Sequence, residues 1–332
     1  MTTYSYSRLT SYHQCQYGFY LNYIRKFPAQ QNVYGLLGGK VHELLEQLQV
    51  NEITNDQAIE KFKDACAEME LNEFYFPSES IARSYKKSVT HYLKHFKPYE
   101  CESCEIEKEF LLEIEGVKLL GFIDLILKHD DGTVSIIDHK TSSKYAKAEK
   151  LKNGRQLVIY AIALGQLGYQ VREVGWSMLK YARVKVADGR YKTVARDKIA
   201  LEFFNQISAQ MELLDIPTEF KGPMLEEARA SCSIDNLPEE IQDVIEINPV
   251  IVEYELTDEL IDEAKAFIVN TVRDIESKSD DPDEWEPVKI DDRSSFFCGT
   301  LCNQRHNCKF YQAYKDNFQK NSIMDELREI FG

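Results

Sequence analysis

Apolar side chains recur at helical spacing through most of the first hundred residues. From Ser7 onward, where Ser7 or Thr10 could cap the helix, the apolar positions are Leu9, Tyr12, Tyr17, Tyr20, Leu21 and Ile24. Similar spacing, with Ser78 as a further candidate cap, continues over residues 37–49, 56–71 and 78–96. Because this period matches the turn of an α-helix, the pattern predicts a mainly helical amino-terminal region.

After Pro98 the pattern changes to short β-branched or alternating runs. Three runs, at 105–114, 117–128 and 133–138, are separated by Glu-Gly and Asp-Asp-Gly turns and predict an antiparallel meander. The expected elements that follow are a helix at 154–167, a strand at 174–184 and a helix at 196–214. Beyond Pro217 the sequence predicts a loop-rich acidic stretch, which over residues 217–249 could be either an ordered insertion or a mobile loop. A strand at 250–256, a helix at 258–277 capped by Thr257, and a segment that carries cysteines are expected to follow.

Composition indicates that the chain can form one compact α/β body. Its 332 residues are 43% hydrophobic and include only 9 Pro and 15 Gly, which leaves little material for a flexible linker. We therefore expect a single domain, 1–332, with a helical part at 1–100, a core at 101–215 and an acidic, cysteine-bearing part at 216–332. The core is expected to hold a central mixed sheet between helices. The polar amino terminus and the shortness of the apolar runs favour a cytoplasmic protein without a membrane partner.

Charge is distributed unevenly along the chain. The formal net charge of −15 would argue against a nucleic-acid partner if it were spread evenly. Residues 140–198, however, hold 14 Lys or Arg against 4 Asp or Glu, whereas residues 201–292 hold 6 against 26. The basic block is compatible with a phosphate backbone, and the acidic block could be a docking or inhibitory surface.

Two carboxylates and a lysine fall on the predicted central strands. Asp124 lies within the strand at 117–128, and Asp138 and Lys140 stand at the end of the next strand. Neighbouring antiparallel strands can bring the two carboxylates together, as a hard divalent cation requires, and Asp138 and Lys140 share one face. Such a cation can activate water and bind a phosphate oxygen, while Lys140 can orient the water or offset charge. This arrangement is typical of a nuclease.

The order of motifs around these residues resembles the RecB-like branch of the PD-(D/E)XK nuclease superfamily. That branch carries a helical Gly-x-x-x-His, then Gly-x-x-Asp, then Asp-x-Lys-Thr, and finally a helical Gln-x-x-x-Tyr. This chain contains them in that order as Gly38 to His42, Gly121 to Asp124, Asp138 to Thr141, and Gln156 to Tyr160. The resemblance implies a restriction-endonuclease-like α/β fold with helices on both sides of a mixed sheet.

The same resemblance implies a deoxyribonuclease that depends on Mg²⁺ or Mn²⁺. Its implied metal ligands are His42, Asp124, Asp138 and His139, and its implied catalytic residues are Asp124, Asp138, Lys140, Gln156 and Tyr160. Glu107 or Glu109 could add a carboxylate from the preceding strand. DNA would approach along basic side chains that read no sequence, namely Lys144, Lys147, Lys150, Lys152 and Arg155. The run GLLGGK at 35–40 is one residue short of a phosphate-binding loop, so no nucleotide-driven motor is expected.

Four of the eight cysteines form a second candidate site. Cys298, Cys302 and Cys308 are separated by three and five residues, and three such thiolates call for a fourth ligand. A subset of the RecB-like nucleases is similar here, including AddB-type subunits and CRISPR-associated adaptation nucleases, and takes that ligand from the first helix, where this chain has Cys15. The resemblance implies a [4Fe-4S] cluster that joins the chain ends. In that subset two residues usually separate the first two of the late cysteines, whereas three separate Cys298 from Cys302 here. Zn²⁺ is therefore the alternative metal, bound by the four cysteines or by three of them together with His306 or His13.

These observations favour a nuclease of recombination, repair or phage DNA processing, expected to act as an exonuclease on DNA ends or single strands. It could act alone or with a protein partner in a DNA-processing complex. The alternative is a noncatalytic DNA-binding or scaffold subunit that keeps the fold and the metal clasp, which the intact Asp124, Asp138 and Lys140 disfavour. Cleavage polarity and strand preference stay open.

Overall fold

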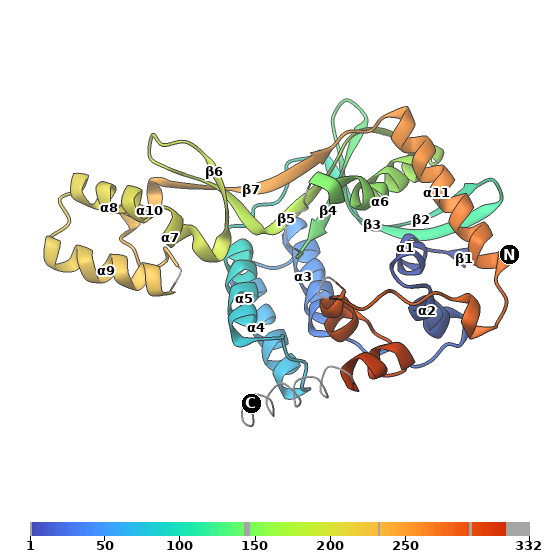
Figure 1. Cartoon of the computed structure of the whole chain (residues 1–332). Helices are drawn as coiled ribbons and strands as arrows, with labels where there is room; N and C mark the ends of the chain where they lie inside the picture. The colour runs from blue at the N-terminus through green and yellow to red at the C-terminus, as the bar shows by residue number, and fades with distance from the viewer. Residues whose placement is uncertain (1, 143–146, 232, 292–293, 317–332) are drawn as a thin grey trace, which may run out of the picture. The chain divides into compact units, whose positions relative to one another are not determined.

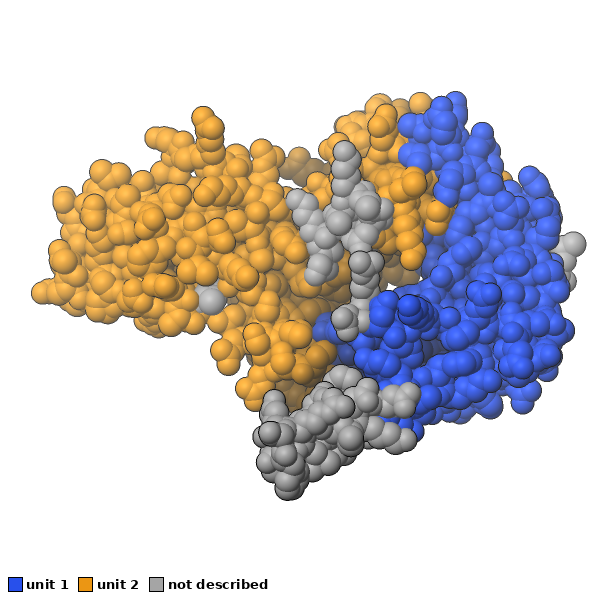
Figure 2. All heavy atoms as spheres, viewed as in Figure 1, with its two compact units in different colours: residues 1–36, 109–122, 257–332 blue, residues 37–108, 123–256 orange. Residues whose placement is uncertain are grey.

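The computed structural model describes residues 2–142, 147–231, 233–291 and 294–316. Figure 2 shows two compact units that interleave along the chain: unit 1 comprises residues 1–36, 109–122 and 257–332, and unit 2 comprises residues 37–108 and 123–256. The helix α3 (Val33–Gln49) and the strands β2 (Ser103–Ile114) and β3 (Val117–Lys128) each contribute residues to both units. The division predicted at residues 100 and 215 stays a prediction.

A mixed sheet lies at the centre of unit 2 (Figure 1). The second half of β3 runs antiparallel to β4 (Thr133–Lys140), with Leu125 opposite Ile137. β4 is parallel to β5 (Gln170–Val186), and β5 also pairs with the antiparallel strands β6 (Lys192–Ala195) and β7 (Ile245–Tyr254). The predicted α/β class with a central mixed sheet is therefore confirmed. The predicted strand at 133–138 continues to Lys140, and the one at 250–256 begins earlier, at Ile245.

Helices cover both faces of this sheet. Alternation along β4 directs Lys140 to one face, where its ammonium group donates to Gln156 of α6 (Lys147–Gln166). Ser177 of β5 neighbours His139 in the β4–β5 ladder and therefore belongs to the opposite face. There its hydroxyl is 3.0 Å from that of Tyr92 on α5 (Glu79–Lys94). The helices α6 and α5 thus sandwich the strands that carry the predicted catalytic residues.

Side-chain caps set the beginnings of two helices in unit 2. Thr54 forms a capping box with Gln57 at the start of α4 (Asn55–Leu71). Ser78 caps α5, as predicted, by accepting from the backbone N–H of Ile81. The predicted helices at 37–49, 56–71 and 78–96 are confirmed as α3, α4 and α5, with small differences at their ends.

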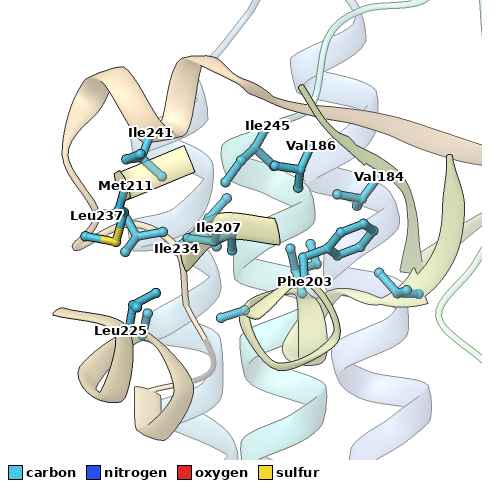
Figure 3. Close-up of a cluster of buried hydrophobic side chains, with 14 of the residues drawn as sticks. Val184, Val186, Phe203, Ile207, Met211, Leu225, Ile234, Leu237, Ile241 and Ile245 are labelled. Carbon is cyan, nitrogen blue, oxygen red and sulfur yellow. The ribbon is translucent and has the colours of Figure 1, made fainter. Parts of the chain in front are cut away.

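A helical insertion with its own core follows β6 in unit 2. Its elements are a 3₁₀ turn η2 (Arg196–Lys198), α7 (Ile199–Glu202), α8 (Phe204–Leu213), α9 (Thr218–Ser231) and α10 (Glu239–Asp243). Figure 3 shows that side chains from these helices gather against the end of β5 and the start of β7; the labelled ones include Phe203, Ile207, Met211, Leu225, Ile241, Val184 and Ile245.

The structure differs from the single helix predicted here and decides that the stretch after Pro217 is an ordered insertion. The single helix expected at 196–214 is divided into η2, α7 and α8, because Phe203 leaves the helical conformation and turns into the core. The stretch after Pro217, expected to be rich in loops, forms α9 and α10, because its scattered apolar residues are buried; examples are Leu225, Ala228, Leu237 and Ile241. The acidic residues between them stay at the surface and dominate the sequence pattern.

Unit 1 is mainly helical. β1 (Thr3–Tyr4) pairs in parallel with the first half of β3, at Lys118 and Leu119. The long α11 (Asp258–Ser277) is capped by Thr257, as predicted, and packs against α1 (Tyr6–Gln14), where the hydroxyl of Tyr12 donates to Asp274 at 2.5 Å. A 3₁₀ turn η3 (Pro282–Glu284) precedes the buried Trp285, which stacks on Phe19.

The amino-terminal helix differs from its prediction. Its cap is Ser5, which accepts from the backbone N–H of Arg8, and neither Ser7 nor Thr10 has this role. The helix ends at Cys15, whose extended backbone (φ −163°) begins a second helix, α2 (Gln16–Phe19), and a π-helical turn, η1 (Tyr20–Ile24), follows. Among the described helices, we find none with the length and apolar character of a membrane span.

Candidate active site

Three potential metal ligands from different elements of unit 2 converge. They are His42 of α3, Glu107 of β2 and Asp124 of β3, whose ligand atoms all lie within 4.8 Å of one another. The Nδ1 atom of His42 is 3.4 Å from Oδ2 of Asp124. The same carboxylate oxygen accepts the backbone N–H of His139 at 2.9 Å, which fixes Asp124 against β4. An imidazole with two carboxylates is a suitable ligand set for Mg²⁺ or Mn²⁺.

A kink in β2 brings Glu107 into this group. Its φ angle is +46°, a left-handed conformation that is uncommon for a residue other than glycine. Because of the kink, Glu105 and Lys108, three residues apart, form an ion pair of 2.7 Å that a flat strand would not allow. Glu105 is also held by Lys128 at 2.8 Å and by the hydroxyl of Tyr169 at 2.7 Å. Of the two glutamates considered from the sequence, Glu107 is thus the one in the group.

Glu46 is a neighbour of this group that the sequence reasoning missed. It lies one helical turn after His42 on α3. Burial raises the pKa of Glu46, and the negative charges of Glu107 and Asp124 raise it further, whereas His42 opposes the rise. The four-residue interval from His42 is the signal that could have identified it.

Asp138 and Lys140 form a close ion pair beside these ligands. Leu125 and Ile137 are opposite each other, so Asp124 and Asp138 are the next residues in the antiparallel register. Asp138 is 1% exposed, and its Oδ2 lies 2.6 Å from Nζ of Lys140. Burial raises the pKa of Asp138 to about 6, against the opposing effect of the Lys140 ammonium group.

Burial and neighbouring groups also have opposite effects on the pKa of Asp124. Burial raises the pKa of Asp124, and the imidazole of His42 and the N–H of His139 work in the other direction. Two buried carboxyl groups in adjacent strands repel each other when both are ionised. This environment favours a bound cation.

Lys140 is also connected to α6. Its Nζ donates to Oε1 of Gln156 at 3.1 Å, and Nε2 of Gln156 donates to the hydroxyl of Tyr160 at 2.7 Å. Burial raises the pKa of Tyr160, so the side chain stays a neutral phenol. The structure therefore joins the predicted residues Asp138, Lys140, Gln156 and Tyr160 in one chain of contacts.

His139 lies on the other face of β4. It is 5% exposed, and its ring centroid is 6.2 Å from that of Tyr99 and 6.1 Å from that of His42. Burial lowers the pKa of His139 to about 3, which keeps the imidazole neutral. Neither His139 nor Asp138 belongs to the three-ligand group found among the described residues, so their roles as metal ligands stay predictions.

The predicted DNA-contacting residues are placed only in part. Lys150 and Arg155 are half-buried and Lys152 is exposed. Lys144 and the side chain of Lys147 lie outside the described residues. The helix α6 begins at Lys147 and not at 154 as predicted, so four of the predicted basic residues belong to the helix that carries Gln156, namely Lys147, Lys150, Lys152 and Arg155.

In unit 1 the four predicted cysteine ligands line one cavity. Cys15 comes from the start of α2, Cys298 from the π-helical turn η4 (Phe297–Leu301), and Cys302 and Cys308 from the residues after it. Most of the other side chains that line this cavity are apolar or aromatic, including Pro287, Val288, Ile290, Phe297 and Phe310.

Backbone N–H groups point at the sulfur atoms. Cys15 accepts from Gly18 at 3.3 Å and from Val288 at 3.4 Å. Cys302 accepts from Gln304, and Cys308 accepts from Phe310 and Tyr311. Donors of this kind stabilise thiolates that bind a metal.

Comparisons with known proteins agree with this geometry. The family model of the PD-(D/E)XK nuclease superfamily matches residues 3–308. A stretch of 172 residues is 28% identical to an ATP-dependent helicase/deoxyribonuclease subunit of Streptococcus mutans and covers 48% of this chain. The stretch is only 16% of that relative, so the likeness concerns a small part of it. Because the family model covers most of the chain, including both candidate sites, this protein belongs to the PD-(D/E)XK nuclease superfamily.

Proposed function

We propose that this protein is a deoxyribonuclease that depends on Mg²⁺ or Mn²⁺ and that its active site lies in unit 2. The observation that carries the proposal is the ion pair of Lys140 with Asp138 next to three converging ligands, His42, Glu107 and Asp124. The membership in a nuclease superfamily supports the reaction class.

The side chains suit hydrolysis of a phosphodiester. A divalent cation, when bound, would lower the pKa of a coordinated water and neutralise charge on the phosphate. Lys140 is held from two sides, by Asp138 and by Gln156, so its ammonium group has a fixed position from which to orient water or offset negative charge. Tyr160 keeps Gln156 in place through its hydroxyl group.

The proposed substrate is DNA, on which the nuclease would act from an end or as a single strand. Lys150, Lys152 and Arg155 precede Gln156 on α6 and can contact phosphates without reading sequence. The Streptococcus mutans relative is named for a helicase and a deoxyribonuclease, which supports a role in recombination, repair or phage DNA processing beside a protein partner.

The test is cleavage of end-labelled DNA by anaerobically purified protein. Lys140→Ala should slow cleavage in Mg²⁺ by about 10²- to 10³-fold, the usual cost of removing one such electrostatic contact. It should leave the circular dichroism and DNA binding unchanged. Lys63→Ala, which removes an exposed lysine of α4, is the control and should cut normally. Unreduced cleavage by Lys140→Ala would overturn the assignment, and wild-type protein that binds DNA but never cuts would favour a noncatalytic role.

Metal titrations test the ligands separately. Asp124→Asn and Asp138→Asn should weaken Mg²⁺ binding in titration calorimetry. His139→Ala decides whether this neutral imidazole is also a ligand. The position of the released label gives the polarity and distinguishes an exonuclease from an endonuclease.

We further propose that the four cysteines of unit 1 hold a [4Fe-4S] cluster. Their common cavity and the N–H groups aimed at their sulfur atoms support thiolate ligation of a metal. Four thiolates are the usual ligands of a [4Fe-4S] cluster, and Zn²⁺ bound by the same cysteines is the alternative.

Metal analysis of the anaerobic protein tests this second proposal. The expected result is about four irons and four sulfides per chain and a broad absorbance band in the visible range. Cys15→Ser should lose both, whereas Cys101→Ser of unit 2 should retain them. One zinc per chain without iron would establish the alternative.

A further inference from the structure

The four-cysteine cavity of unit 1 concentrates negative charge. Four thiolates in a mostly apolar pocket carry a desolvation cost unless positive charge or hydrogen bonds compensate for it. The N–H groups described above supply hydrogen bonds. Among the described residues that line the cavity, the cationic side chain is that of Arg305.

Arg305 is held beside the thiolates by its own segment. It lies midway between Cys302 and Cys308 in the sequence, and its Nη1 donates to the backbone carbonyl of Cys302 at 3.2 Å. The side chain is half-buried and is an electrostatic neighbour of both the Cys302 sulfur and the Tyr311 hydroxyl. Within the described ranges, no carboxylate comes within 4.0 Å of its guanidinium group. Its charge therefore acts on the Cys302 sulfur, and no carboxylate in the described part of the chain pairs with it.

Lys309 provides a contrast from the same segment. It is adjacent to Cys308 but lies outside the cavity lining. Its ammonium group is 3.7 Å from a carboxylate oxygen of Asp283 and lies over the rings of Tyr17 and Phe310. The two cations carry the same charge, but of this pair it is Arg305 that lines the cysteine cavity.

We infer that Arg305 is the positioning residue that compensates the charge of the metal-bound thiolates and so sets how firmly the metal group is held. The inference rests on the proposed metal at the four cysteines. Because the added electron of a reduced cluster increases the negative charge, a nearby guanidinium also favours reduction. Removing it should lower the reduction potential as well as the retention of the group.

The test compares Arg305→Gln, Arg305→Lys and Lys309→Gln in anaerobically purified, metal-loaded full-length protein. The first readout is the rate at which a chelator and air bleach the visible absorbance. The second is the potential found by redox titration. Arg305→Gln should lose the group about five- to tenfold faster and have a more negative potential; a tenfold change in the reduced-to-oxidised ratio corresponds to about 59 mV for one electron.

The other two variants separate charge from structure. Arg305→Lys keeps the charge and should recover most of both properties, whereas Lys309→Gln should change the loss rate by less than about twofold, because its charge is paired with Asp283. Equal loss rates and potentials for Arg305→Gln and wild type would overturn the inference, and so would equal effects of Arg305→Gln and Lys309→Gln. Wild-type protein without bound metal would instead overturn the cluster itself.

Discussion

At the scale of single residues, one backbone angle decides which glutamate joins the metal ligands. Glu107 adopts φ +46° and lies within 4.8 Å of the ligand atoms of His42 and Asp124. Residues in this conformation cost free energy, about 1–3 kcal/mol, and persist where the surrounding contacts enforce them. Here Glu105 is held next to the kink by Lys128 and Tyr169, which lie outside β2. The strained conformation of β2 thus places Glu107 as a third candidate ligand.

Glu107→Gln should therefore weaken Mg²⁺ binding by at least about tenfold while the protein stays folded. The amide keeps the shape of the side chain but removes a negative ligand from the group. The measurement is the Mg²⁺ concentration for half-maximal cleavage, with calorimetry to confirm the affinity. Glu109→Gln, which changes the neighbouring glutamate of the same strand, is the matched control and should behave as wild type. If the two variants require the same Mg²⁺ concentration, Glu107 is not a ligand.

Motif spacing predicts part of this site, misses Glu46, and does not decide between Glu107 and Glu109. Asp138, Lys140, Gln156 and Tyr160 have local intervals of two and four residues, and the structure joins them as those intervals suggest. Glu107 depends on a kink that alternation cannot foresee, because the contacts of Glu105 that cause it come from β3 and from Tyr169. Local periodicity predicts which residues are neighbours within one element, whereas contacts between elements can be identified only from the three-dimensional fold.

At the scale of elements, α6 is fitted closely against β7 at Gly154. A Cβ atom there would lie 2.1 Å from ring atoms of Tyr254, far inside van der Waals contact. Replacing glycine by alanine within a helix normally stabilises it by about 0.5–1 kcal/mol. At Gly154 the sign should reverse, with a loss of about 1–3 kcal/mol from overpacking. Cleavage should slow as well, because Gln156 and Tyr160 belong to the same helix.

Urea unfolding and DNA cleavage of Gly154→Ala measure the two effects. Gly165→Ala in the same helix is the control, since nothing lies within 4 Å of its added Cβ, and it should be neutral or stabilising. Tyr254→Ala should recover part of the lost activity when combined with Gly154→Ala. A Gly154→Ala protein that is more stable than wild type would contradict the close contact.

The end of α5 carries two histidines whose burial links stability to pH. Burial lowers the pKa of His91 to about 2 and of His95 to about 4, and the neighbouring Arg196 and Lys94 act in the same direction while Asp235 opposes them. Neutral His91 lies 3.0 Å from the guanidinium of Arg196 through Nδ1. In the unfolded chain both imidazoles take up a proton near pH 6.5, roughly the ordinary histidine pKa.

Between about pH 6.5 and pH 4 the unfolded state therefore binds more protons, and stability should fall as the pH is lowered through this range. Each histidine should account for about 2 kcal/mol at about pH 5, so the two together should account for about 4 kcal/mol. Denaturant unfolding at several pH values measures the slope, and His95→Gln should flatten it. The active-site carboxylates contribute equally to both proteins and cancel in the comparison. An unchanged slope in His95→Gln would show that this imidazole does not titrate on unfolding.

The segment with the late cysteines forms an element that the sequence pattern does not predict, although its cysteines are predicted as candidate ligands. Three residues separate Cys298 from Cys302, one more than the usual spacing, and the chain forms a π-helical turn between them, closed by the N–H of Cys302 and the carbonyl of Phe297 at 2.7 Å. A π-turn takes up one extra residue in a helical segment and is frequent at functional sites. The unusual spacing therefore does not prevent both cysteines from lining the cavity.

At the scale of the whole molecule, the two units are not consecutive segments, and each holds one of the two sites. Unit 2 contains His42, Glu107, Asp124 and Lys140, and unit 1 contains the four cysteines. Composition along the sequence could not predict this interleaving, because α3, β2 and β3 each contribute to both units without any linker between them. Long-range contacts such as that of Tyr12 with Asp274 stabilise unit 1, and no local sequence pattern predicts them.

If the cysteines hold the proposed metal group, its loss should destabilise unit 1 more than unit 2. Cys15 belongs to the first segment of unit 1 and Cys298, Cys302 and Cys308 to the last, so a bound metal group would close a very long loop of chain and restrict the unfolded state. By analogy with other cross-links of long loops, its removal should cost about 2–4 kcal/mol.

Native-state hydrogen exchange on Cys15→Ser should show faster exchange in α1 and α11 of unit 1 and little change in β4 and β5 of unit 2. Cys101→Ser, which changes a half-exposed thiol of unit 2, should leave α1 and α11 protected. Equal loss of protection in both units would mean that the clasp stabilises the molecule as one cooperative body.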